Sequence, residues 1–258
     1  YLMMNTLKIL GCSGSIGGSA ATTCLQFNED ILIDAGSGLL NQPLTTLEKI
    51  DHILLTHSHL DHILGIPLLA DAVGFKRKDP INVLGCSETI SVIKQHIFNG
   101  LVWPDFSILP TKVNPFIKLN EIFSNSSTKL SELTFTPFYV NHTVRCIGYK
   151  ISSPKSSIIF SGDTGPSDNL IEMINRTEKI KAVIIDVSFS KKKIDIAKKS
   201  KHFNPSMLIK ELKKIKNKQT IYITHFKPGC EDEIIGELES ANIVHTVKAL
   251  KINQTITF

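Results

Sequence analysis

Long hydrophobic runs are missing from this sequence of 258 residues. No apolar stretch reaches the roughly 20 residues that a membrane-spanning helix needs, and no secretory signal is visible, so we expect no association with a membrane. Paired cysteine spacing is also missing, because the five cysteines are scattered: Cys12, Cys24, Cys86, Cys146 and Cys230. An odd, dispersed set favours reduced thiols in a cytoplasmic protein over a disulfide framework.

A strong excess of one charge is absent as well. The formal net charge of +5 suits an anionic substrate but does not by itself indicate nucleic acid. No internal repeat and no domain linker are visible, and the contents of 42% hydrophobic and 21% charged residues are ordinary for a globular protein. We therefore expect residues 1–258 to form a single α/β domain with a sizeable core.

A stretch dense in histidine, Thr-His-Ser-His-Leu-Asp-His at residues 56–62, carries the strongest chemical signal in the chain. It follows a short apolar run that is typical of a buried strand. Residues at i and i+2 of an extended chain point the same way, so His57 and His59 can bind one ion together. The turn that follows directs Asp61 and His62 toward a second ion. This spacing favours a metal site over a chance cluster of histidines on a solvated turn.

Short apolar runs between turn residues predict two series of strands and helices. Strands are expected at residues 7–10, 22–27, 31–34, 51–56, 81–84, 133–140, 146–151, 157–160, 182–186 and 220–224, with a closing pair near 244–247 and 252–258. Helices are expected at residues 44–49, 63–74 (just past the metal loop), 88–98, 168–175, 204–217 and 231–240, and residues 110–132 are interpreted as a surface connection. Two halves that each lead with strands and close with helices predict two packed sheets with helices outside, an αββα sandwich.

A glycine-rich segment at residues 11–18 follows the first expected strand. Its glycine spacing does not match a dinucleotide-binding fingerprint, and the next apolar segment is a strand rather than a helix. A flexible loop beside a pocket and a plain tight turn both stay open.

Three later polar residues each end an apolar run. His142, Asp163 and His225 stand where a packed core would not require a polar side chain, at the ends of expected strands. For one such residue alone, a capped strand end would explain the pattern. Together with the four ligand types of the histidine-rich stretch they supply seven donors, enough for two ions that share one carboxylate.

These motifs, in this order and over nearly the whole chain, resemble the ligand series of the metallo-β-lactamase superfamily of dinuclear hydrolases. The resemblance implies the αββα fold and two divalent ions, with zinc expected and manganese or iron left open. It also implies a partition of ligands: His57, His59 and His142 on one ion, Asp61, His62 and His225 on the other, and Asp163 bridging them. True β-lactamases usually carry cysteine or serine in place of Asp163, which argues against that activity.

Within the superfamily, His-Leu-Asp-His followed by Ile63, Gly65 and Ile66 resembles the signature of class II cyclic-nucleotide phosphodiesterases, although residues 67–71 depart from its tail. Residues 101–106 resemble a segment common in bacterial members. The resemblance implies hydrolysis of a 3′,5′-cyclic nucleotide such as cAMP to a 5′-monophosphate, with a hydroxide shared by the two ions as nucleophile.

Two aromatic residues and a further histidine complete the candidate site. Trp103 and Phe106 either stack on the base of a substrate or pack on the core. His202 resembles the histidine that phosphodiesterases of this superfamily, including ribonuclease Z, use at the scissile phosphate. Asp186 stands where such enzymes often carry a glutamate that orients that histidine. The candidate catalytic residues are thus Asp61, His202 and Asp186, and a structural role for His202 at a helix start is the alternative.

Two other activities stay open. A ribonuclease Z-like nuclease is disfavoured because the chain lacks a long basic insertion rich in glycine and proline, and we interpret the lysines of residues 191–218 as a solvated face. A thioester or lactone hydrolase of glyoxalase II type would give His202 no clear task. The expected partner is a small anionic phosphodiester, with nucleic acid disfavoured and a homodimer left open.

Overall fold

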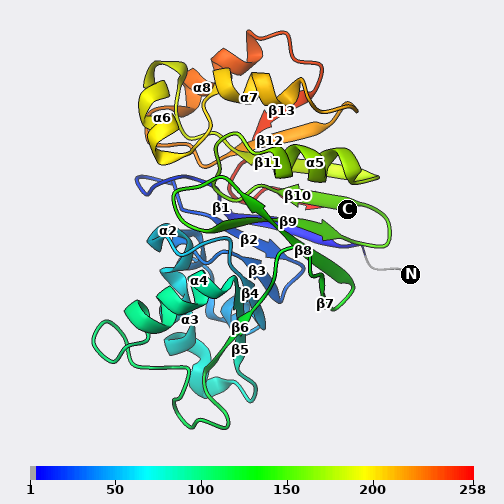
Figure 1. Ribbon diagram of the computed structural model, residues 1–258. Helices are drawn as coiled ribbons and strands as arrows, with labels where there is room; N and C mark the ends of the chain where they lie inside the picture. Colours follow the sequence, from blue (N-terminus) through cyan, green and yellow to red (C-terminus); the bar gives the residue numbers. More distant parts are fainter. Residues whose placement is uncertain (1–3) are drawn as a thin grey trace.

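The computed structural model describes residues 4–258, so only residues 1–3 of the predicted domain lie outside the described part. Two mixed sheets of seven strands each dominate it (Figure 1). The first sheet has the order β14 (Thr255–Thr257), β1 (Thr6–Gly11), β2 (Cys24–Phe27), β3 (Ile31–Ile33), β4 (His52–Leu54), β5 (Ile81–Gly85) and β6 (Ile117–Glu121). The second has the order β13 (Thr246–Ala249), β12 (Thr220–Thr224), β11 (Ile180–Asp186), β10 (Ser157–Phe160), β9 (Cys146–Ser152), β8 (Leu133–Val140) and β7 (Thr128–Leu130).

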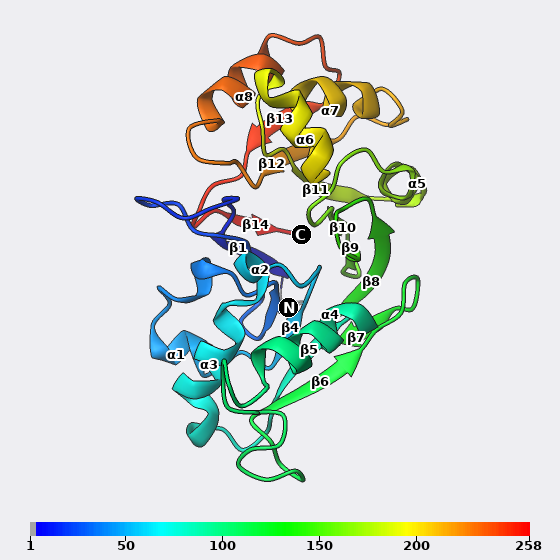
Figure 2. The ribbon, with the colours of Figure 1, turned by 60° about the vertical axis from the view of Figure 1, so that its left-hand side comes forward.

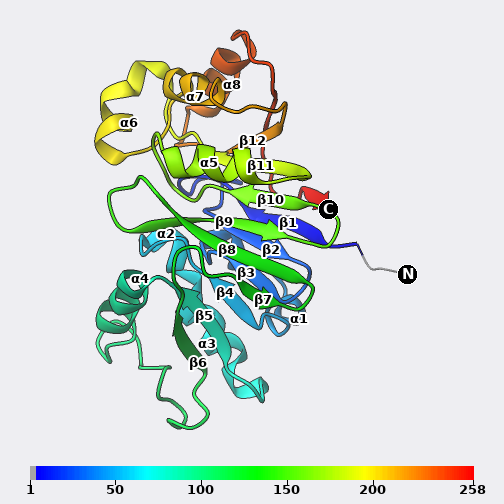
Figure 3. The same cartoon turned by 45° about the vertical axis from the view of Figure 1, so that its right-hand side comes forward.

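Helices cover the outer face of each sheet, as the turned views show (Figures 2 and 3). The first sheet carries α1 (Leu44–Leu47), α2 (Leu60–Ile63), α3 (Gly65–Val73) and α4 (Ser87–Val92), with short turns at Ser37–Leu39, Gly74–Lys76 and Ile93–Ile97. The second carries α5 (Asp168–Arg176), α6 (Ile194–Ser200), α7 (Pro205–Leu212) and α8 (Glu231–Glu239), with a turn at Lys191–Lys193. The predicted αββα sandwich is confirmed.

Three hydrophobic clusters separate these four layers, and the strands supply them by alternation. Ile31 and Ile33 lie in the cluster between the sheets, whereas Leu32 faces the cluster under α3 and α4. Ile184 likewise points between the sheets, while Ile185 faces the cluster under α5, α7 and α8. Successive side chains of a strand point to opposite faces. A strand buried on both faces therefore reads as a continuous apolar run, which is why these strands were recognisable in the sequence.

The predictions made without a local signal were wrong in three places. Residues 110–132 contain strands β6 and β7, each of which forms an edge of one of the two sheets, rather than a plain connection. The closing strands do not pair with each other: β13 joins β12, and β14 joins β1. The lysine-rich stretch, which we interpret as a solvated helical face, contains a separate helix α6 before the expected one, and α7 ends at Leu212 rather than near residue 217.

The direction of the strands gathers several loops at one edge of the sandwich. β3 and β4 run parallel in the first sheet, and β10, β11 and β12 run parallel in the second. β8 has the same direction as β10, because both are antiparallel to β9. The residues that follow these strands meet where the two sheets approach each other, with the backbone N–H of Ile147 donating to the carbonyl of Thr56 at 3.0 Å. In α/β sheets this carboxyl edge is the usual place of a ligand site.

Candidate metal centre

The histidine-rich stretch leaves β4 in extended form and then turns directly into helix α2. His59 is the N-cap of α2, and Asp61 and His62 lie in its first turns. The helix therefore begins before these two residues, not after them as the sequence analysis expected. Asp61 and His62 are held by helical geometry, while His57 and His59 project from the extended segment. The loop is thus supported by a rigid element at each end.

The first group of donors contains His57, His59, His142 and Asp163, whose candidate ligand atoms all lie within 4.8 Å of one another. Nε2 of His142 lies 3.3 Å from Nδ1 of His59, and Nε2 of His57 lies 3.8 Å from Oδ2 of Asp163. These residues come from the loop after β4, the loop after β8 and the loop after β10. The structure therefore brings together the donors that the sequence predicted for one ion.

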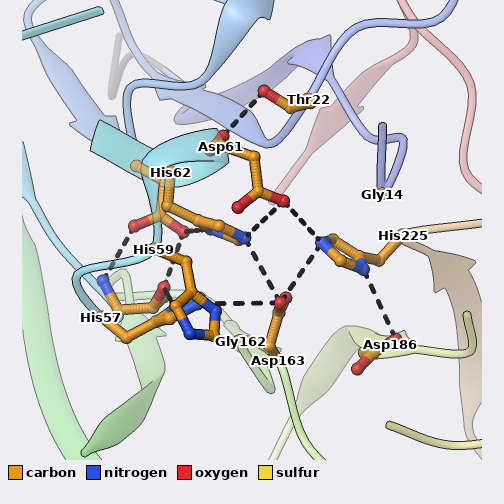
Figure 4. Close-up of polar contacts among 12 residues, drawn as sticks. Gly14, Thr22, His57, His59, Asp61, His62, Gly162, Asp163, Asp186 and His225 are labelled. Atoms are coloured by element: carbon orange, nitrogen blue, oxygen red, sulfur yellow. Dashed lines mark hydrogen bonds and ion pairs between the residues drawn. The ribbon is translucent and has the colours of Figure 1, made fainter. Parts of the chain in front are cut away.

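The second group contains Asp61, His62 and His225, again with ligand atoms within 4.8 Å (Figure 4). Oδ2 of Asp61 lies 3.7 Å from Nε2 of His62 and 3.5 Å from Nε2 of His225. Asp163 adjoins this group too, with its Oδ2 at 3.4 Å from His62 Nε2 and 3.2 Å from His225 Nε2. Asp163 thus stands between the two groups, where the predicted bridging carboxylate belongs.

The donors themselves fit a cation. Nε2 of His57, His62 and His225 are buried and have no hydrogen-bond partner among the described residues, yet all three approach the same carboxylate oxygen. Buried polar atoms in proteins normally have partners, so three orphaned nitrogens around one carboxylate point to a cation as their missing partner. Zinc is usually bound by four ligands, and imidazole nitrogens and carboxylate oxygens suit it. Manganese and iron also accept such donors.

Burial and charge set the protonation of these groups. Burial and the neighbouring His62 hold the pKa of His57 well below its usual value, and burial lowers the pKa of His142 to about 4. Both imidazoles are therefore neutral at pH 7 and keep a lone pair for a cation. Burial alone would raise the pKa of Asp163, but His225 and His62 outweigh it and hold that pKa well below its usual range. Asp163 remains charged, as a bridging ligand must be.

Asp34 is a supporting residue that the sequence analysis missed. It is fully buried and accepts hydrogen bonds from His62 Nδ1 at 2.7 Å and from the backbone N–H and hydroxyl of Thr56, both at 2.8 Å. A carboxylate behind a ligating histidine fixes the ring orientation and makes Nε2 a better donor. The signal was present in the sequence, since Asp34 directly follows a buried strand just as His225 does.

The segment after α6 supports His142 in a similar way. Nδ1 of His142 lies 3.3 Å from the carbonyl oxygen of Lys201, and the Lys201 ammonium donates to the carbonyl of His142 at 2.9 Å. Lys201 adopts a left-handed conformation with φ of 53°, which turns the chain at the end of α6. Nothing in the local sequence indicated this contact, because the two residues are 59 positions apart.

The glycine-rich segment lies beside the second group of donors, which resolves its role in favour of a loop at the site. A Cβ atom on Gly14 would lie 2.8 Å from Nδ1 of His225 and 2.5 Å from its carbonyl oxygen. Only glycine allows this approach. The backbone of His225, with φ of 67°, is held by a hydrogen bond from its N–H to the carbonyl of Cys12 at 2.8 Å.

His202 and Asp186 form the pair that the sequence suggested. Nδ1 of His202 lies 2.6 Å from Oδ2 of Asp186, which is fully buried. The His202 ring stacks on His225, with centroids 5.2 Å apart and an interplanar angle of 17°. Burial alone would lower the pKa of His202, but the carboxylate of Asp186 outweighs it and raises that pKa. His202 therefore stands at the edge of the donor groups with one ring nitrogen engaged.

Phe106 does not occupy the place expected of a base-stacking residue. Only 6% of it is exposed, and its ring packs against Phe98 and Phe116 in the core under α3 and α4. Trp103 is half-buried and packs at the margin of the same cluster, 6.5 Å from the Phe106 ring. A ring without an exposed face is not placed to stack on a base, so for Phe106 this geometry favours the core-packing alternative.

Comparisons with known proteins agree with this geometry. Residues 29–226 match the family model described as the beta-lactamase superfamily domain. Ribonuclease Z of Pyrococcus horikoshii is 33% identical over 125 residues, which are 47% of this chain and 38% of that protein. The probable 3′,5′-cyclic-nucleotide phosphodiesterase of Yersinia pestis is 25% identical over 228 residues, 76% of this chain and 64% of that protein. The chain thus spans less than two thirds of the length of either relative.

The fold has close counterparts among solved structures. The metallo-beta-lactamase fold protein YhfI from Bacillus subtilis superposes with a TM-score of 0.80 at 18% sequence identity, over 98% of this chain and 99% of that one. No helix in the described part of this chain has the length and apolar character that crossing a bilayer requires. The matched family model covers most of the chain and includes all seven predicted ligands. The chain belongs to the metallo-beta-lactamase superfamily.

Proposed function

We propose that this protein is a phosphodiesterase that uses two divalent ions, zinc in the first instance, and hydrolyses 3′,5′-cyclic nucleotides to 5′-monophosphates. The observation that carries the proposal is the His202–Asp186 pair beside two complete groups of donors. Metal-dependent hydrolysis as such needs only the residues that bind the ions. A phosphodiester also expels an alkoxide, and a histidine held at the edge of the site can protonate it.

The ions, when bound, lower the pKa of water and polarise a phosphoryl oxygen. The chain's own residues do the rest. Asp163 stays charged and draws the Nε2 atoms of three histidines toward one point. Asp186 engages Nδ1 of His202, so Nε2 is the ring nitrogen left to meet the substrate. In its protonated form His202 donates from Nε2 to the leaving oxygen or to an equatorial phosphoryl oxygen.

Two features favour a cyclic nucleotide over the other candidates. Similarity to the phosphodiesterase of Yersinia pestis extends over 228 residues, against 125 residues for the archaeal ribonuclease Z. A thioester expels a thiolate that needs no proton, so the paired histidine would have no task in a hydrolase of glyoxalase II type. The nuclease remains the second candidate, because exposed lysines on α6 stand directly before His202 in the chain.

A substrate panel tests the proposal. Purified protein loaded with zinc is assayed against 3′,5′-cyclic AMP and GMP, bis-nitrophenyl phosphate, a transfer-RNA precursor and lactoylglutathione. Asp163→Ala is the matched control, because it removes the shared carboxylate and reveals any contaminating hydrolase. Release of a 5′-monophosphate by the wild-type protein alone is expected. Processing of the RNA precursor without turnover of cyclic nucleotides would instead establish the nuclease.

A further inference from the structure

Asp186 does more than hold His202. Its carboxylate is fully buried and accepts three hydrogen bonds: from His202 Nδ1 at 2.6 Å, from the hydroxyl of Ser188 at 2.6 Å and from the backbone N–H of Thr164 at 3.0 Å. Thr164 is the residue after the candidate bridging ligand Asp163. One carboxylate therefore contacts both the loop of the bridging ligand and the non-ligand histidine, and the role of its third partner, Ser188, has to be explained.

Ser188 lies between the carboxylate and a metal-ligand candidate. Its hydroxyl oxygen is 3.0 Å from Nδ1 of His225, while Oδ1 of Asp186 is 3.8 Å from that nitrogen, beyond hydrogen-bond distance. The Ser188 side chain is fully buried. The serine hydroxyl is thus the only direct polar partner of His225 Nδ1 among the described residues.

The number of protons decides the direction of these bonds. A serine hydroxyl has one proton to donate and lone pairs that accept. The short contact to a buried carboxylate takes that proton, because a hydrogen bond to a charged acceptor is the stronger one. Ser188 has no second proton for its two histidine contacts, at 3.0 Å from His225 Nδ1 and 3.2 Å from His202 Nδ1. Nδ1 of His202 is already engaged by Asp186 at 2.6 Å, and at the other contact Ser188 must accept, so Nδ1 of His225 carries the proton. This leaves the lone pair on Nε2, the atom 3.2 Å from Asp163 and 3.5 Å from Asp61.

We propose that Ser188 is a positioning residue of the metal centre. Its hydroxyl links the carboxylate of Asp186 to Nδ1 of His225 by two hydrogen bonds and so orients the His225 ring for the second ion. The carboxylate of Asp186 then orders three parts of the site at once: the loop of Asp163, the ligand His225 through Ser188, and His202 directly. The stacked rings of His202 and His225 agree with this, since both present Nδ1 to the same pair of residues. The proposal rests on the two-metal site and not on the choice of substrate.

The test compares Ser188→Ala with Ser188→Thr, which retains the hydroxyl, and with Ser190→Ala, a fully buried serine two residues on that takes no part in these bonds. Zinc affinity is measured by competition with a chromophoric chelator, and zinc content by elemental analysis. We expect Ser188→Ala to bind one of its two ions about 10–100-fold more weakly, the usual effect of losing a partner behind a ligand. Ser188→Thr should restore most of that affinity, and Ser190→Ala and His202→Ala should keep both ions.

A second measurement needs no variant that could misfold. Long-range proton–nitrogen spectra of the zinc-loaded wild type, with ¹⁵N-labelled histidine, report which ring nitrogen of His225 carries the proton. A proton on Nδ1 of His225 in the wild type supports the proposal. A proton on Nε2 in the wild type, or unchanged affinity for both ions in folded Ser188→Ala, would overturn it. Wild-type protein that binds no zinc would refute the metal centre itself, an outcome distinct from failure on cyclic nucleotides.

Discussion

Replacement of His202 by alanine separates a phosphodiesterase from the other hydrolases of this fold. His202 lies near Asp163 and His225, but it is not one of the seven predicted ligands, and its Nδ1 is engaged by Asp186, so the variant should keep both ions. It loses the ring nitrogen that we propose meets the substrate. One positioned acid or oxyanion donor is worth roughly 10²–10⁴ in kcat, which corresponds to about 3–5 kcal/mol of transition-state stabilisation. KM should change little, because the donor acts on charge that develops in the transition state.

The leaving group sharpens this test. Steady-state kinetics on 3′,5′-cyclic AMP and on bis-nitrophenyl phosphate are compared for the wild type and His202→Ala. The aryl leaving group of bis-nitrophenyl phosphate needs no proton, so His202→Ala should lower kcat less on this substrate than on the cyclic nucleotide. His96→Ala, an exposed histidine, is the control for a simple loss of imidazole. Near wild-type turnover of a cyclic nucleotide by folded His202→Ala with two ions would refute the mechanism and reopen the choice of substrate.

Four further outcomes are expected. Asp163→Ala should abolish turnover and lose at least one ion, because its carboxylate adjoins both donor groups; elemental analysis showing two tightly held ions would contradict this. Asp34→Ala should lower the free energy of unfolding by about 3–5 kcal/mol, since His62 and Thr56 lose a buried charged acceptor, and chemical denaturation measures it. Phe106→Ala should lower the free energy of unfolding by about 3–5 kcal/mol, because a buried ring is lost, while KM of the folded protein stays near wild type. A raised KM at unchanged stability would instead support a role of Phe106 in stacking on the base. Chelation of the metals should remove activity and lower the melting temperature, with zinc restoring both, and full activity of metal-free protein would exclude the proposed chemistry.

The layers of the fold and the candidate donor residues could be predicted from the sequence because each depends on a few adjacent residues. A strand buried on both faces is a short apolar run, and a ligand at its carboxyl end is a polar residue that ends the run, as at Asp163 and His225. The spacing of His57 and His59 on extended chain needs no distant information either. Local signals of this kind specify which residues face a site, but not which of them meet.

Tertiary structure decided everything that depends on contacts between distant parts of the chain. The last strand pairs with the first, with Thr257 opposite Thr6, and no local pattern distinguishes this pairing from a closing hairpin. Phe106 is aromatic in either role, and only the packing of Phe98 and Phe116 around it favours the core-packing alternative. Ser188 reads as an ordinary loop serine until Asp186, two residues before it, and His225, 37 residues after it, meet at its hydroxyl. The candidate ligands could be predicted from the sequence because metal binding demands particular side chains. The residues that orient them need only one hydrogen-bonding group at the right point in space, and the fold alone determines where that point lies.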